Sequence, residues 1–454
     1  MSAPNATARL GAYVQRCAAE PLPPAVMEKA AICLLDAIGL ALIARDETTA
    51  AAARSIAVAV PDGPGTARIW VDGIRTVLSE AVTANAVAVH AHFHDDSDHA
   101  SWSHPGSFIV PVAGSMGDAA DLPLERVLRA IVAGYTVTNW LGADEEVARA
   151  LIARGIRTSP TLGTIGASAA AAVALNLDEA GCRNAVAMAA NITGGLLEPV
   201  RCGSDEWRVQ NAQAARGGLL AAQLAGRGVL GAPDALEGAK GFLRSLPGLV
   251  EPPARWRRDP RPESLLDLSA KPFATLGDNM APVVAAREIH LAGVPTERIR
   301  AIRISMMRAY TEYPGTNYKG PFERPVQTLA STAFAVAAML VLGELEYDVA
   351  LERREDPAIL RLVPLTIIEP HDGAYNEAVV TVELDDGTRM ERTAADAPAT
   401  LIYQDRARAL EVFRGRLASC GFDQRVAAGI EADTFGKGSV SVRQLLDRLF
   451  ISRI

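Results

Sequence analysis

The sequence predicts a mainly α-helical protein with a large all-helical domain built from both termini and a smaller α+β lid domain. Alanine-rich segments with apolar residues three and four positions apart recur up to about residue 250. The segment 299–307 (IRAIRISMM) alternates as a strand does, and 375–392 reads as a hairpin with an Asp-Gly turn. From about residue 403 the amphipathic helical pattern returns. We therefore predict a helical domain, a smaller domain inserted into it, and a return to the first.

The helical segments of the first half share small residues on their packing faces, which lets helices approach closely. They are expected at 26–44, 79–93, 124–141, 164–177, 178–194 and 212–228. The Pro/Arg-rich stretch 251–264 marks the end of the purely helical pattern. Another long helix is expected around 329–340. The predicted domains are a helical domain at 1–265, completed by 403–454, and an α+β lid domain at 266–402.

Composition excludes several classes of protein. Of 454 residues, 49% are hydrophobic and 22% charged, which is enough to build a large core and argues against disorder. The net charge of −8 is spread without a basic block, so nucleic acid and anionic membranes are not expected as partners. The five scattered cysteines indicate reduced thiols rather than a disulfide framework.

Two further patterns concern location and cofactors. The N-terminus has no apolar run typical of a signal peptide, and the uncharged run 326–343 contains enough polar residues to indicate a buried helix. We therefore expect a cytoplasmic protein. The stretch Gly226–Gly231 matches GxGxxG, but a helix precedes it where a dinucleotide site needs a strand, so it predicts a helix end and a turn.

Five of the seven histidines lie in one segment, together with three aspartates. They are His90, His92, His94, His99 and His104, with Asp95, Asp96 and Asp98. Such a cluster is compatible with a metal site, with acid/base chemistry in which carboxylates tune histidine pKa values, or with a solvated helix end.

Three observations weigh against the metal site. The preceding pattern is helical, which would place His90 and His94 on one face and His92 about 160° away. Only His290 and His371 remain elsewhere to complete a second ligand set. The aspartate run also lacks the glycine that a calcium loop needs at its turn. Acid/base chemistry without a metal is the interpretation that requires least.

Two other places carry candidate residues. Lys271 lies where the helical pattern meets the α+β pattern, and a lysine there is either a solvated hinge charge or a group that moves protons. The Gly- and Pro-punctuated stretch 308–325 contains Tyr318 and is a candidate substrate loop.

Several segments in order resemble the MmgE/PrpD family, whose members include 2-methylcitrate dehydratases, cis-aconitate decarboxylases and iminodisuccinate epimerases. The matching blocks are 34–42 (LLDAIGLAL), 83–118 around the histidines, 163–179, 213–231, 271–273 (KPF) and 331–345. The resemblance implies a helical domain formed by both termini, an α+β lid, a homodimer, and no obligatory cofactor or metal.

The sequence also departs from the family pattern. Phe93 stands where relatives carry an aspartate, Arg157 where they carry a histidine, and Trp207 where they carry a lysine. Phe334 stands in place of a tyrosine, and a histidine is missing near Asn279. The scaffold is retained while several proton carriers are replaced.

The expected function is that of a cofactor-independent lyase or isomerase that moves a proton at a carbon next to a carboxylate of a small substrate. The expected catalytic residues are His104, Lys271, Asp95, Asp96 and His94. The expected substrate-binding residues are His90, Ser97, Arg157, Arg208 and Tyr318. Dehydration, decarboxylation and epimerisation remain open. The alternatives are a non-catalytic ligand-binding relative and a metal-dependent hydrolase that uses the His/Asp cluster.

Overall fold

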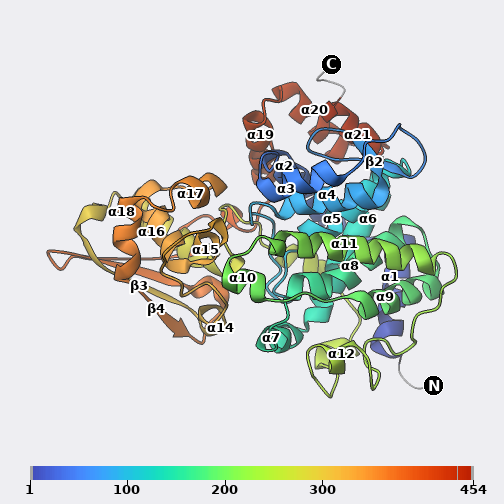
Figure 1. Cartoon of the computed structure of the whole chain (residues 1–454), viewed down its shortest axis with the longest axis horizontal. Coiled ribbons are helices and arrows are strands. Elements are labelled where there is room, and N and C mark those ends of the chain that lie inside the picture. Colours follow the sequence, from blue (N-terminus) through green and yellow to red (C-terminus); the bar gives the residue numbers. More distant parts are fainter. Residues whose placement is uncertain (1–3, 437, 451–454) are drawn as a thin grey trace. The chain divides into compact units, whose positions relative to one another are not determined.

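The computed structural model describes residues 4–436 and 438–450 and confirms a mainly α-helical fold (Figure 1). The chain divides into two compact units. The first comprises the described residues up to Leu196, residues 208–269 and those from Asp405 onward; the second comprises 197–207 and 270–404. The segment 197–207, for which the sequence predicts a place in the helical domain, clusters with the second unit, where Gly203 lies next to the side chain of Gln327.

The first unit is helical apart from one short hairpin. Its helices are α1 (Ala6–Ala19), α2 (Pro24–Ile43), α3 (Thr48–Ile56), α4 (Leu78–His90), α5 (Gly106–Ala119), α6 (Leu124–Gly142), α7 (Glu146–Ala153), α8 (Thr158–Ala174), α9 (Glu179–Ile192), α11 (Glu206–Ala225, which begins in the second unit), α12 (Phe242–Ser245), α19 (Arg406–Ser419), α20 (Gln424–Phe435) and α21 (Val442–Phe450). Figure 1 shows the C-terminal helices (red) beside α2 (blue), and α19 packs against α2. Both ends of the chain therefore build one core.

Small residues bring the central helices of this unit together, as the sequence predicts. A Cβ atom at Gly166 of α8 would lie 2.9 Å from the carbonyl oxygen of Gly134 in α6. A Cβ atom at Gly218 of α11 would lie 2.5 Å from the Cβ of Ala167 in α8. Atoms at these positions would have to displace backbone, so α6, α8 and α11 form a close-packed layer only because glycine occupies the contacts.

One short hairpin interrupts the helical pattern that the sequence predicts for this unit. Strands β1 (Thr66–Arg68) and β2 (Arg75–Val77) form a two-stranded antiparallel sheet before α4. Three residues are too few to show an alternating pattern in the sequence.

The second unit combines a mixed sheet with helices. The strands are β3 (Ile299–Met307), β4 (Thr366–His371), β5 (Val379–Leu384) and β6 (Arg389–Thr393), in the order β4-β3-β5-β6. β3 pairs parallel with β4 and antiparallel with β5. The helices are α10 (Glu198–Cys202), α13 (Met280–Leu291), α14 (Arg308–Thr311), α15 (Pro325–Ala330), α16 (Thr332–Leu342), α17 (Tyr347–Glu352) and α18 (Pro357–Leu362), and α13 packs between the sheet and α16.

Three detailed predictions can be compared directly with these elements. The strand predicted at 299–307 is β3, and the predicted hairpin is β5–β6 with Gly387 at φ 82° in its turn. The uncharged run 326–343 forms α15 and α16, separated at Ser331. No helix in the described part of the chain is long and apolar enough to span a membrane.

Candidate functional site

The histidine-rich segment connects α4 to α5 within the first unit. The predicted helix through residue 93 is wrong, because α4 ends at His90. Phe93 adopts a left-handed conformation (φ 55°) and its N–H donates to the carbonyl of His90 at 3.1 Å. A bulky residue in this region of φ/ψ space ends a helix. His90 and His94 therefore do not share a helical face, and each side chain has its own surroundings.

Arg208 holds the beginning of this segment. Its Nε donates to the carbonyl oxygen of Ala91 at 2.8 Å and lies 3.5 Å from Oε1 of Glu47. Glu47 in turn accepts the N–H groups of Thr49 and Ala50 at the start of α3. A guanidinium satisfies orphan carbonyls at a helix C-terminus, and a carboxylate does the same for N–H groups at an N-terminus. One buried arginine thus ties the end of α4 to the beginning of α3.

His90 is fully buried, and partners occupy both of its ring nitrogens. Nδ1 lies 2.8 Å from Oδ2 of Asp95, and Nε2 lies 2.8 Å from Nη2 of Arg157. Because a guanidinium only donates, Nε2 is the acceptor and Nδ1 carries the proton that Asp95 accepts. His90 is therefore a neutral imidazole between a cation and an anion. Arg157, at the N-terminal end of α8, also donates to Oε1 of Gln210 at 3.2 Å.

His104 is held by its Nδ1 and by its backbone. Nδ1 lies 2.8 Å from the backbone carbonyl oxygen of Asp96 and 3.3 Å from Oγ of Ser97. A carbonyl oxygen only accepts, so Nδ1 carries the proton and Nε2 is the basic nitrogen of the neutral ring. The His104 N–H donates to Oγ of Ser159 in α8 at 3.2 Å. The ring is thus fixed in one tautomer while its side chain stays partly exposed.

Asp96 directs its carboxylate into the protein interior. Oδ1 accepts the N–H of Gly106, the first residue of α5, at 2.8 Å, and Oδ2 accepts the hydroxyl of Tyr135 in α6 at 2.6 Å. Burial raises the pKa of Asp96 to about 7, although the hydrogen bonds from Tyr135 and Gly106 oppose this rise. Asp96 consequently changes charge close to neutral pH.

Three aromatic rings contact one another at the centre of the segment. The ring of Phe93 lies 5.5 Å from that of His90 and 5.2 Å from that of His104, both edge to face. The two histidine rings are 5.6 Å apart. Phe93 therefore packs against the side chain with the basic nitrogen, at the position where a carboxylate is expected in relatives.

The remainder of the segment forms a tight loop. Ser97 pairs with Ser269 through two backbone hydrogen bonds, and Nε2 of His99 lies 3.0 Å from Oγ of Ser269. The buried carboxylate of Asp98 accepts the hydroxyl of Ser101 at 2.5 Å and the amide of Asn139 at 2.9 Å. Asp98 therefore stabilises this loop through its hydrogen bonds to Ser101 and Asn139.

The two remaining histidines of the segment, His92 and His94, are both largely buried. Burial, followed by the charges of Arg208 and Arg416, lowers the pKa of His92 to about 3, so this ring is neutral at physiological pH. His94 is buried, with 5% of its surface exposed. Helical phase cannot relate the two rings, because both lie beyond the end of α4.

Lys271 and Tyr318 belong to the second unit. The ammonium of Lys271 is buried and donates to the carbonyl oxygen of Thr275 at 3.1 Å. The hydroxyl of Tyr318 donates to the carbonyl oxygen of Pro321. The other eight predicted site residues lie in the first unit, at or next to the histidine segment.

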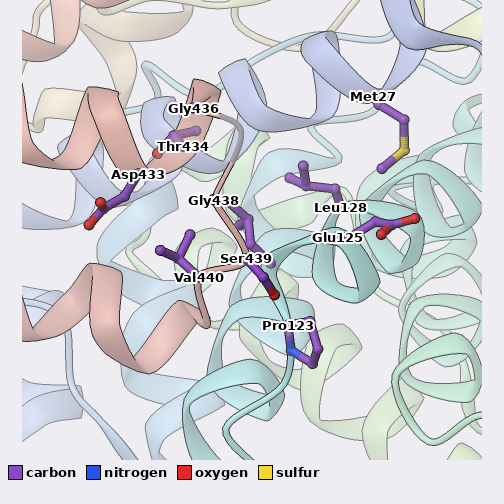
Figure 2. A pocket seen from close by; sticks show the side chains of 11 residues that line it. Met27, Pro123, Glu125, Leu128, Asp433, Thr434, Gly436, Gly438, Ser439 and Val440 are labelled. Atoms are coloured by element: carbon purple, nitrogen blue, oxygen red, sulfur yellow. The ribbon is translucent and has the colours of Figure 1, made fainter.

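A separate hollow of about 320 Å³ lies in the first unit, between α2, α6 and the connection from α20 to α21 (Figure 2). Figure 2 shows Met27 and Leu128 beside it and Ser439 on the connection. Its lining residues include none from the histidine segment, so this hollow is not the candidate site. Within residues 4–436 and 438–450, no three His, Cys, Asp or Glu side chains are grouped so that they could hold a metal ion.

Comparison with known proteins decides the family. Residues 8–252, more than half of the chain, match the family model described as the MmgE/PrpD N-terminal domain. The chain belongs to the MmgE/PrpD family. It is also 25% identical over 428 residues to the cis-aconitate decarboxylase-like protein oryM of Aspergillus oryzae, covering 86% of each chain.

The MmgE/PrpD scaffold places residues in this site that sequence reasoning missed. They are Tyr135, Ser159 and Glu47, which hold Asp96, His104 and Arg208 respectively. Tyr135 and Ser159 lie in apolar helical segments and Glu47 precedes α3, so no local motif distinguishes them from ordinary packing or capping residues. Only the long-range contacts identify them.

Proposed function

We propose that this MmgE/PrpD protein is a cofactor-independent lyase or isomerase that transfers a proton at a carbon next to a carboxylate. The observation that carries the proposal is the hydrogen bond from Nδ1 of His104 to the Asp96 carbonyl. It leaves Nε2 as a base whose ordinary pKa is close to neutral pH, which suits proton removal from a carbon acid. Membership of a family that includes dehydratases and decarboxylases supports the same class of reaction.

The substrate is proposed to be a small molecule with one or more carboxylates. The relative from Aspergillus oryzae is named for a decarboxylase of such an acid. Of the cationic candidates, Arg208 is committed to the backbone at Ala91, and Arg157 donates to His90. Lys271 also donates to a backbone carbonyl, that of Thr275, but its ammonium has three donors, and we propose that it too is required for turnover.

The experiment incubates chelator-treated protein in D₂O with a panel of di- and tricarboxylates and their amino analogues. Deuterium uptake at carbon indicates proton transfer; a new alkene indicates dehydration, and released CO₂ indicates decarboxylation. We expect one of these products, and we expect it to be lost in His104→Ala and in Lys271→Ala with unchanged circular dichroism. Absence of exchange with every compound would favour a non-catalytic ligand-binding relative.

We also propose a homodimer, with the exposed side of α11 as the contact. Leu220 and Leu224 lie one helical turn apart on α11 and are 50% and 37% exposed. Ile192 at the end of α9 is 53% exposed and lies next to Gly217 of α11. A double variant with glutamate at both leucines should halve the mass measured by light scattering, whereas Leu291→Glu in the second unit should not. A wild-type monomer would refute the proposal.

A further inference from the structure

Buried hydrogen bonds join Tyr135 on α6 to Asp96, and Asp96 to His104, within the histidine segment. We infer that Asp96 is a positioning residue for His104 and that Tyr135 determines the charge state in which Asp96 holds it. The inference rests on the proposed function only where turnover is measured, because the position of His104 can be observed without a substrate.

Asp96 makes two hydrogen bonds that hold the His104 ring and the backbone just after it. Its backbone carbonyl accepts Nδ1–H of His104 at 2.8 Å, and its carboxylate accepts the N–H of Gly106, two residues further on, at 2.8 Å. The second contact also places a negative charge at the N-terminus of α5, where the helix dipole stabilises it. The two hydrogen bonds together fix the loop from which the His104 ring projects.

Tyr135 hydrogen-bonds to the other carboxylate oxygen of Asp96, Oδ2. Its buried hydroxyl donates to Oδ2 at 2.6 Å, and the thiol of Cys33 on α2 is a neighbouring acid. When Asp96 is ionised, both of its oxygens accept. When it is protonated, the Gly106 N–H still occupies Oδ1, so the added proton lies on Oδ2. The Tyr135 hydroxyl can accept this proton only if it turns its own hydrogen away from Asp96.

Burial and neighbouring acids bring the pKa of Asp96 close to neutral, although the hydrogen bond from Tyr135 lowers it. Asp36 and Cys33 face Asp96 from α2, Tyr135 from α6, and Asp95 from its own segment. All of them are acids, and burial is the main reason why the pKa of Asp96 lies at about 7. Protonation removes the charge-assisted part of the contact with α5, which weakens the support of His104 as pH falls through 7.

The test uses Tyr135→Phe and Asp96→Asn, with Tyr13→Phe as a matched control. Tyr13 is another buried tyrosine next to a cysteine, Cys17, but it lies on α1. Removing the Tyr135 hydroxyl deletes a hydrogen bond that favours ionised Asp96, which should move the transition upward by about one pH unit. Asparagine keeps an acceptor for Gly106 but cannot titrate, so the part of the transition due to Asp96 should disappear and only the protonation of the His104 ring itself should remain.

The first readout is the ¹⁵N spectrum of the imidazole groups in the whole protein, with the His104 signals assigned by their loss in His104→Gln. Wild type should show the Nδ1–H tautomer and a shift of its signals near pH 7. The part of this shift that follows Asp96 should move upward in Tyr135→Phe and should be absent in Asp96→Asn, where only the ring's own protonation remains. Tyr13→Phe should match the wild type. If the pH dependence of the His104 signals is the same in Asp96→Asn and Tyr135→Phe as in the wild type, the inference is wrong.

The second readout is the pH profile of turnover on any carboxylate that exchanges deuterium. Turnover should fall as pH falls through 7, the midpoint should rise in Tyr135→Phe, and kcat should change more than KM. Exchange with unaltered imidazole spectra would leave the proposed function standing and refute the positioning role. If the imidazole spectra change in the variants but no substrate exchanges deuterium, the positioning role stands and the proposed function is refuted. If Tyr135→Phe fails to fold, Asp96→Asn decides alone.

Discussion

Asp96→Asn and His92→Gln are expected to change the pH dependence of folding free energy in opposite directions. The pKa of Asp96 is raised from 3.8 to about 7, mainly by burial. Its favourable contribution to the folding free energy is therefore fully present below pH 4 and is lost as pH rises through 7. The pKa of His92 is lowered from 6.5 to about 3, mainly by burial and by Arg208. Its contribution is present above pH 6.5 and is lost as pH falls.

The two contributions nearly cancel in the wild-type protein between pH 5 and 8. With folded pKa values of about 7 and about 3, linkage gives a loss of about 2.5 kcal/mol from Asp96 and a gain of about 2 kcal/mol from His92 over this interval. Groups common to all variants drop out when each variant is compared with wild type at the same pH. Each single substitution therefore isolates one contribution.

The assay is urea unfolding followed by far-UV circular dichroism at pH 5, 6.5 and 8. Relative to wild type, Asp96→Asn should gain about 2.5 kcal/mol from pH 5 to 8, and His92→Gln should lose about 2 kcal/mol. A difference between wild type and Asp96→Asn that stays constant across the three pH values would refute the burial argument for Asp96. The same result for His92→Gln would refute it for His92.

The remaining predictions concern two arginines that the structure assigns to holding the segment. Arg208→Met removes a buried charge-assisted donor and leaves Glu47 without this cation, so we expect a destabilisation of about 2–3 kcal/mol, measured by thermal unfolding. Arg157→Met deprives Nε2 of His90 of its donor and should destabilise by about 1–3 kcal/mol. Arg408→Met, which breaks an exposed pair on α19, is the control and should change stability by less than about 0.5 kcal/mol. Equal effects at all three positions would contradict the assignment.

The sequence predicted the elements whose pattern is local and periodic. β3 begins and ends where the alternation of Ile299 to Met307 begins and ends, and the β5–β6 turn follows from Asp386-Gly387. The end of α4 could not be predicted in this way, because Ala91 and Phe93 continue the helix-compatible spacing past His90. The helix stops there because Phe93 takes a left-handed conformation and Arg208, 117 residues beyond Ala91, binds the last carbonyl.

The candidate site was indicated by clustering but not resolved by it. Five histidines within fifteen residues identified the segment, and spacing says nothing about which nitrogen of each ring carries a proton. The tautomers of His90 and His104 follow from Arg157 and from a backbone carbonyl, and both contacts depend on the fold. The positions of Tyr135 and Ser159 on α6 and α8 are likewise set by helix packing.

The most direct test of the account is the rate of solvent deuterium exchange at the substrate carbon in His104→Ala, with and without added imidazole. Loss of the base should slow exchange on the order of 10²–10⁴-fold, and free imidazole should restore part of the rate. A folded His104→Ala protein that exchanges deuterium at the wild-type rate would contradict the assignment of His104 as the base.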